Sequence, residues 1–119
     1  MKNYKKYIIF LTLVSLPVFA HAGNPPKGEV WLFLANNYKG EPHYKSSKDI
    51  PELPKNFEGK DFQGQVSSVK VGPHTKVILY EEINYGGEHV TIEHNTPILA
   101  NANKPFNDRA RSLKVQKKE

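Results

Sequence analysis

The chain has 119 residues, of which 38% are hydrophobic, with a formal net charge of +5 and no cysteine. This length suits one small domain. The missing cysteines exclude disulfides, zinc–thiolate sites and thiol catalysis, so stability must come from apolar packing, with or without a bound ion or partner.

The first 22 residues have the features of a secretory signal peptide. Lys2, Lys5 and Lys6 give a basic start, an apolar run follows at residues 8–20, and Ala20-His21-Ala22 places small residues where a signal peptidase reads them. We therefore expect cleavage after Ala22 and a protein that is periplasmic or secreted; the alternative is an uncleaved N-terminal anchor.

Cleavage changes what the composition implies about partners. It removes three lysines and lowers the net charge to +2, which leaves little long-range field, so no nucleic acid partner is expected. The apolar run is shorter than the roughly 20 residues of a spanning helix, so no membrane insertion is expected after cleavage.

Beyond a short flexible lead-in at residues 23–28, the sequence predicts strands and no helices. Runs rich in β-branched, aromatic and aliphatic residues indicate buried strands at Val30–Leu34 and Lys76–Tyr80. Alternating apolar and polar residues indicate half-buried strands at Val66–Val71, His89–Glu93 and Arg111–Val115. Residues 49–64 and 95–108 are rich in Pro, Asn, Gly and Lys and are expected to be long surface loops. This pattern is typical of an all-β sandwich.

The sequence also contains an internal repeat. Residues 30–40 align with 77–87, and residues 62–71 align with 106–115, without gaps. Each copy has an aromatic residue, four further residues, a second aromatic residue, one residue and a glycine. We expect the second ring to lie against the first across a tight hairpin, with the glycine at a positive φ or at a close backbone approach.

With this repeat the chain resembles the βγ-crystallin family from about residue 29 to residue 116. The signature residues of the family are Phe33, Tyr38, Gly40 and Ser68 in the first copy and Tyr80, Tyr85, Gly87 and Ser112 in the second. The resemblance implies two four-stranded Greek-key motifs, at about 29–72 and 76–116, packed as a β-sandwich about a pseudo-twofold axis. It also implies that the serine of each motif pins the folded hairpin.

Microbial members of this family often bind two calcium ions through a six-residue stretch that contains Asn or Asp twice, any two residues, Ser or Thr, and Ser. These residues supply the hard oxygen ligands that calcium prefers. The family pattern combines the fifth-position hydroxyl and third-position carbonyl of one motif with the second-position side chain of the other. The corresponding stretches of this chain are residues 63–68 and 107–112.

Both stretches depart from that pattern. One site loses two side-chain ligands, because Gly64 and Arg111 stand in their positions, and the Arg111 guanidinium is expected near the place of the ion. The other site keeps Ser67, Asp108 and the Gln65 carbonyl, so at most one weak calcium site is expected. Alternatively, Asp108 only caps the turn before the last strand.

Other candidate sites are discounted, and no enzymatic activity is expected. The four histidines after residue 22 lack the helical spacing of a zinc enzyme. Glu81 and Glu82 lie at a predicted hairpin and should be solvated, and no nucleophile motif accompanies them. Trp31 is expected to share a face with Phe33 and lie in the core, or alternatively to anchor a partner at the surface.

Two functions follow from this reading. The first is a non-enzymatic exported domain with a structural or adhesive role and degenerate calcium binding. The alternative is a secreted protein-binding module, such as a protease inhibitor or toxin-like effector, whose partner the sequence does not identify. Its binding loop would be Ser46–Gly59, which Pro51 and Pro54 stiffen, or Asn95–Pro105, although either loop can also be a plain connection.

Overall fold

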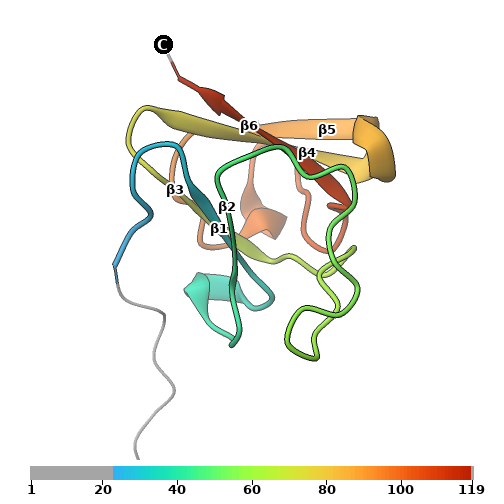
Figure 1. Ribbon diagram of the computed structural model, residues 1–119. Helices are drawn as coiled ribbons and strands as arrows, with labels where there is room; N and C mark the ends of the chain where they lie inside the picture. The colour runs from blue at the N-terminus through green and yellow to red at the C-terminus, as the bar shows by residue number, and fades with distance from the viewer. Residues whose placement is uncertain (1–22, 119) are drawn as a thin grey trace, which may run out of the picture.

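Two antiparallel sheets pack face to face in the computed structural model, which describes residues 23–118 (Figure 1). Sheet A has the order β2-β1-β3 and consists of Tyr44–Ser46, Val30–Phe33 and Ser68–Val71. Sheet B has the order β5-β4-β6 and consists of Gly86–Ile92, Thr75–Glu82 and Ser112–Lys117. The signal peptide predicted at residues 1–22 lies outside the described residues.

The connections contain three short 3₁₀ turns and, within residues 23–118, no α-helix. The turns are η1, η2 and η3, at Asn36–Tyr38, Ile83–Tyr85 and Leu99–Asn101. Over the same residues, no helix has the length and apolar character needed to cross a bilayer. The prediction of an all-β chain is therefore confirmed for the part of the molecule that the structure describes.

The two motifs interlock by exchanging their third strands. Ile50 of the first motif bridges to Leu113 of β6, and Thr96 of the second motif bridges to Val69 of β3. Each exchanged segment forms one β-bridge and few further backbone hydrogen bonds, so its pairing is shorter than in the regular four-stranded units that the resemblance implied. The reason is local, because proline follows both Ile50 and Thr96 and its missing N–H ends the ladder. Each sheet is nevertheless completed by the other copy.

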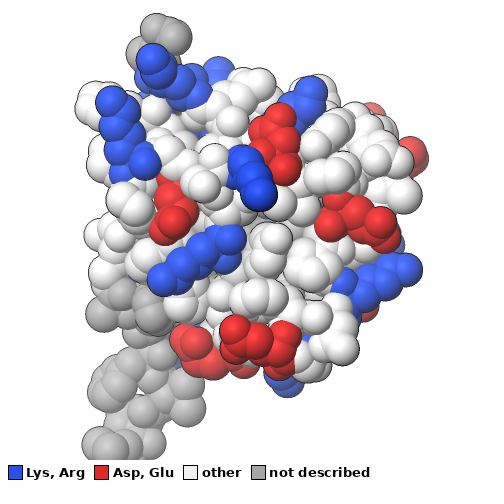
Figure 2. Space-filling model, in the orientation of Figure 1, with Lys and Arg blue, Asp and Glu red and all other residues white. Residues whose placement is uncertain are grey.

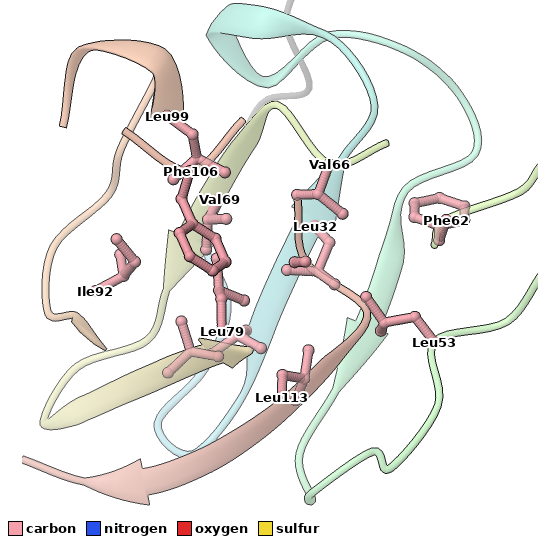
Figure 3. Packing of buried hydrophobic residues seen from close by; sticks show 13 residues of the cluster. Leu32, Leu53, Phe62, Val66, Val69, Leu79, Ile92, Leu99, Phe106 and Leu113 are labelled. Carbon is pink, nitrogen blue, oxygen red and sulfur yellow. The ribbon is translucent and has the colours of Figure 1, made fainter. Parts of the chain in front are cut away.

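The core lies between the two sheets and draws heavily on the long loops (Figure 3). Leu53 and Phe62 come from the first long loop, Leu99 and Phe106 come from the second, and all four are fully buried. The buried cluster consists of Val30, Leu32, Leu53, Phe62, Val66, Val69, Val77, Leu79, Ile92, Leu99, Phe106, Ala110 and Leu113. The loops thus supply apolar volume that short strands cannot provide to a domain of this size.

A second, smaller cluster covers the outer face of sheet A. Trp31 and Phe33 alternate with the core residues of β1, are buried, and share one face, as the sequence predicted. That face points away from the core between the sheets. The His43 ring packs 5.1 Å from both aromatic rings, measured between centroids, and the Trp31 Nε1–H donates to Glu29 at 2.7 Å.

The lead-in at residues 23–28 forms no helix or strand but is packed against the domain. Pro25 is buried, and the Gly28 N–H donates to the Thr75 hydroxyl at 2.7 Å. A Cβ at Gly72 would overlap the carbonyl oxygen of Pro26, so only a glycine there lets the lead-in approach this closely. These contacts do not match the flexible segment that the sequence led us to expect.

Candidate functional site

Each motif folds its first hairpin around a pair of aromatic rings. Phe33 and Tyr38 lie edge to face with their centroids 5.7 Å apart, and Tyr80 and Tyr85 do the same at 5.8 Å. The glycine that follows each pair, Gly40 or Gly87, has a φ of +97° or +75°. Such pairs stabilise by about 0.5–1.5 kcal/mol beyond the area they bury.

A buried serine ties each hairpin to the last strand of its own motif. Ser68 donates to the Ala35 carbonyl at 2.6 Å and accepts from the Tyr38 N–H at 3.0 Å. Ser112 donates to the Glu82 carbonyl at 2.6 Å and accepts from the Tyr85 N–H at 3.0 Å. Both serines are fully buried, so each hydroxyl satisfies two backbone groups at once.

Sequence reasoning missed two features of these hairpins. Both tyrosines have a left-handed backbone, with φ of 59° at Tyr38 and 62° at Tyr85, although bulky residues rarely take this conformation. In addition, Lys70 and Lys114 each place an ammonium 4.8 Å from the centroid of the tyrosine of their own motif. The signal was available, because these lysines align in the repeat.

The surroundings of the hairpins shift three ionisable groups. Burial raises the pKa of the Tyr38 phenol and lowers the pKa of the Lys70 ammonium. For Tyr85, desolvation and then the nearby Asp49 carboxylate and Tyr80 phenol raise the pKa. The raised tyrosine pKa values keep both phenols uncharged, which suits rings that stabilise the hairpins by packing. The lowered pKa of Lys70 is the desolvation cost of holding its ammonium against the Tyr38 ring.

The fold brings the two calcium-type stretches together as symmetric partners. The Gly64 N–H donates to the Ala110 carbonyl at 2.8 Å, and the Asp108 N–H donates to the Val66 carbonyl at 2.9 Å. In each bond, the second position of one stretch meets the fourth position of the other. The structure therefore supplies the cross-motif contact on which the family's calcium sites depend.

Arg111 occupies the space beside Gly64. A Cβ at Gly64 would lie 3.4 Å from Arg111 Nη2, and Arg111 Nη1 donates to the Glu81 carbonyl at 3.1 Å. A permanent cation thus lies beside Gly64, where it opposes the binding of a second cation.

The other site keeps three oxygen-bearing residues that a backbone hydrogen bond brings near one another. The bond from Asp108 to Val66 places Asp108 beside the two neighbours of Val66, Gln65 and Ser67. Ser67 is held on a fixed backbone, because its N–H donates to the Phe33 carbonyl and its own carbonyl accepts from the Leu99 N–H. The donor chemistry fits calcium, but three protein oxygens are half or fewer of the six to eight that it takes. Within residues 23–118, no group of three or more His, Cys, Asp or Glu is arranged to hold a metal.

The two glutamates at the second hairpin differ from each other. Glu82 is exposed, as expected, but the Glu81 carboxylate accepts two bonds from Arg109, at 3.1 and 3.0 Å, and its side chain is only 35% exposed. The prediction of a solvated residue is therefore wrong for Glu81. The ion pair places Arg109 over the Phe106 ring, 4.6 Å from its centroid, and anchors the second stretch.

Backbone hydrogen bonds and ring packing hold the first long connection, the 51–63 loop, in one conformation. Phe57 and Lys60 exchange two backbone hydrogen bonds of 2.8 and 3.0 Å around a two-residue tip in which Glu58 and Gly59 have positive φ. The Phe57 ring packs against Phe62 at 5.9 Å, and the Phe62 N–H donates to the Pro54 carbonyl at 2.9 Å. Its exposed residues are Pro51, Glu52, Lys55, Asn56, Glu58, Gly59, Lys60 and Asp61.

Comparison with known proteins agrees with this architecture. Residues 20–92 match the model of peptidase inhibitor family I36. Spherulin-3A of Physarum polycephalum is 30% identical over 94 residues, which are 79% of this chain and 87% of that protein. Its NMR structure has a TM-score of 0.60 and covers 87% of this chain and 98% of its own. A structure solved in work on the evolution of the eye lens βγ-crystallin domain fold has a TM-score of 0.69 and 30% identity, and the match covers 84% of this chain and 96% of that one.

Proposed function

The chain belongs to the βγ-crystallin family, and from this premise we propose that it is a non-enzymatic exported domain with a structural or adhesive role and at most one weak calcium site. The observation that carries the proposal is the position of Arg111. A guanidinium beside Gly64, bonded to the Glu81 carbonyl, replaces an ion by a side chain that is always charged. The domain then keeps its shape without a metal at that site.

The second site supports weak binding for a different reason. Ser67, Asp108 and the Gln65 carbonyl are all oxygen donors, and only Asp108 brings a negative charge. Asp108 and Gln65 are also exposed, so water competes for the same positions. Calcium sites gain affinity from ligand charge and rigidity, and this set is poor in both.

Calorimetric titration of the chain spanning residues 23–119 with calcium tests the proposal. We expect at most one ion per chain and a stabilisation that grows with the ratio of calcium concentration to Kd, because calcium binds only the folded state. Asp108→Gly, which removes the side-chain ligand and tolerates the φ of 58° at this position, should abolish this binding, whereas Asp61→Gly, which removes a carboxylate outside both stretches, should leave it unchanged. Two ions bound per chain would contradict the proposal.

A reverse variant examines the role of Arg111. In Gly64→Asn/Arg111→Ser, the side-chain oxygens of the family pattern return, and asparagine tolerates the left-handed backbone at residue 64, where φ is +68°. We expect this variant to bind one more calcium ion than the parent chain. If it binds no additional ion, Arg111 is not what disables the site.

Export is a separate part of the proposal and has its own test. The chain is expressed in a bacterial host, and the protein recovered from the periplasm or the medium is analysed by intact mass. We expect the mass of residues 23–119. The full-length mass in the membrane fraction would favour an uncleaved anchor instead.

A second candidate function is peptidase inhibition. It is favoured by the match to peptidase inhibitor family I36 and by the bracing of the 51–63 loop. A loop held in one conformation loses little entropy on binding, and this preorganisation favours tight association. The exposed tip between Phe57 and Lys60 is then the surface presented to the peptidase.

Inhibition assays against serine, cysteine, aspartic and metallopeptidases test this candidate. We expect stoichiometric inhibition of one class. The triple variant Lys55→Ala/Glu58→Ala/Lys60→Ala should lose the inhibition, while Asn101→Ala/Asn103→Ala, in the second long loop, should retain it. If no peptidase of the four classes is inhibited, this candidate function is excluded. If both variants lose inhibition equally, the 51–63 loop is not the contact with the peptidase.

A further inference from the structure

A cavity of about 200 Å³ opens at the end of the sandwich where β6 finishes, away from the calcium-type stretches. Four segments surround it, namely the lead-in, the residues just after β2, the turn between β3 and β4, and the last residues of β6. Three of these segments contribute one basic residue each, and these are Lys27, His74 and Lys117. Figure 2 shows blue side chains gathered at the top of the molecule, the end at which β6 finishes in Figure 1.

Two backbone-anchored hydrogen bonds hold these segments in place. The Gly28 N–H donates to the Thr75 hydroxyl at 2.7 Å, which fixes the residue next to Lys27. The Lys118 N–H donates to the His74 carbonyl at 2.9 Å, which fixes the residue next to Lys117. His74 itself has a left-handed backbone, with a φ of 55°, as residues in tight turns can have. The three basic residues are therefore brought together by the fold.

The cavity is lined by hydrogen-bond donors and by no carboxylate. Besides the basic residues, Ser47 and Gln116, whose side chains carry a hydroxyl and an amide, line it. Within residues 23–118, neither Lys27 nor Lys117 forms an ion pair with a carboxylate. The nearby Asp49 carboxylate does not line the cavity, and it accepts a hydrogen bond from the N–H of the lining residue Val115 at 2.9 Å.

We propose that this cavity binds a tetrahedral oxyanion, either free phosphate or sulfate or the same group carried as an ester on a small molecule. Lysine ammonium groups attract such an anion as point charges, and hydroxyl and amide donors complete its hydrogen bonds. The volume equals that of about six or seven water molecules, so it holds one such group with a small substituent. This site is independent of the calcium-type stretches and of the 51–63 loop.

The neighbouring hollow of about 530 Å³ is larger but fits an anion less well. His74 separates the two spaces and lines both. Glu93 lines the larger hollow, where its carboxylate would repel an anion, and its carbonyl already accepts from the Lys118 ammonium at 3.2 Å. The charges therefore direct the oxyanion to the smaller cavity.

Titration of the ¹⁵N-labelled chain of residues 23–119, which contains every strand of the fold, tests the proposal. The probes are sodium phosphate, sodium sulfate and glucose 6-phosphate, with glucose as the uncharged control, all at constant ionic strength. We expect saturable shifts at the amides of Ser47, Thr75 and Lys117 with the anions and none with glucose. Tighter binding of glucose 6-phosphate than of phosphate identifies an ester ligand, and equal binding identifies the free oxyanion.

Matched variants distinguish specific binding in the cavity from a general attraction of anions to a basic surface. Lys27→Gln and Lys117→Gln should each weaken binding roughly three- to tenfold, as the loss of one charge-assisted hydrogen bond does near a surface. Lys55→Gln makes the same change of charge at an exposed lysine that does not line the cavity, and it should leave the affinity unchanged. Shifts that do not saturate, or equal weakening by Lys55→Gln, would overturn the proposal.

Discussion

Ser112→Ala tests whether the buried serine holds the second hairpin. The substitution removes a hydroxyl that donates to the Glu82 carbonyl at 2.6 Å and accepts from the Tyr85 N–H at 3.0 Å, at a position without solvent access. Each of the two backbone groups left unpaired costs about 1–2 kcal/mol, so we expect a loss of about 2–4 kcal/mol in the free energy of unfolding. This is a large part of the roughly 5–15 kcal/mol of a typical domain and corresponds to a fall in Tm of roughly 10–30 °C.

The repeat provides an internal replicate for this measurement. Ser68 makes the equivalent bonds, also of 2.6 and 3.0 Å, so Ser68→Ala should lose the same free energy within about 0.5 kcal/mol. Ser47→Ala, at an exposed position, should change it by less than about 0.5 kcal/mol. Urea unfolding followed by the fluorescence of Trp31, with a chelator present, gives all three values. A loss below about 1 kcal/mol for Ser112→Ala would refute the reasoning.

Three further predictions concern packing and charge. Gly72→Ala should destabilise the domain by about 1–3 kcal/mol, because the new Cβ displaces the Pro26 carbonyl. Residues 23–28 should then become susceptible to protease, and unchanged resistance in limited proteolysis would contradict this. Phe62→Ala should lower the free energy of unfolding by about 3–5 kcal/mol in urea titrations, since the ring is fully buried, and a loss typical of a surface position would mean that the loop does not fill the core. The hydrogen bond and the charge of Lys104 hold the pKa of Glu88 below its usual 4.5. This pair therefore stabilises the fold above pH 4.5, and the stabilisation is lost as the pH falls through the pKa of Glu88 in the folded state. Lys104→Ala should return the pKa of Glu88 toward 4.5 in an NMR titration, and an unchanged value would exclude the pair as the cause.

Much of the hairpin chemistry could be read from neighbouring residues. The spacing of the two aromatics and the glycine predicted the ring pairs. A positive φ and a contact between two rings both depend on residues that lie close together in the sequence. The departures of Gly64 and Arg111 from the family pattern led us to expect a guanidinium near the place of an ion. The structure puts Arg111 beside Gly64, and the loss of a calcium site there stays a prediction. The ion pair of Glu81 with Arg109 was missed, because those residues are 28 positions apart and no local rule joins them.

The amino-acid sequence by itself determined the strands, the repeat and the residues that turn the chain back at each hairpin. These depend on side-chain periodicity and on φ preferences, which act between near neighbours. Only the tertiary structure decided that Ile50 and Thr96 cross to the opposite sheets and that the lead-in packs under Gly72. It also decided that Lys27, His74 and Lys117 meet at one cavity, because such contacts form only when both motifs bury a shared core.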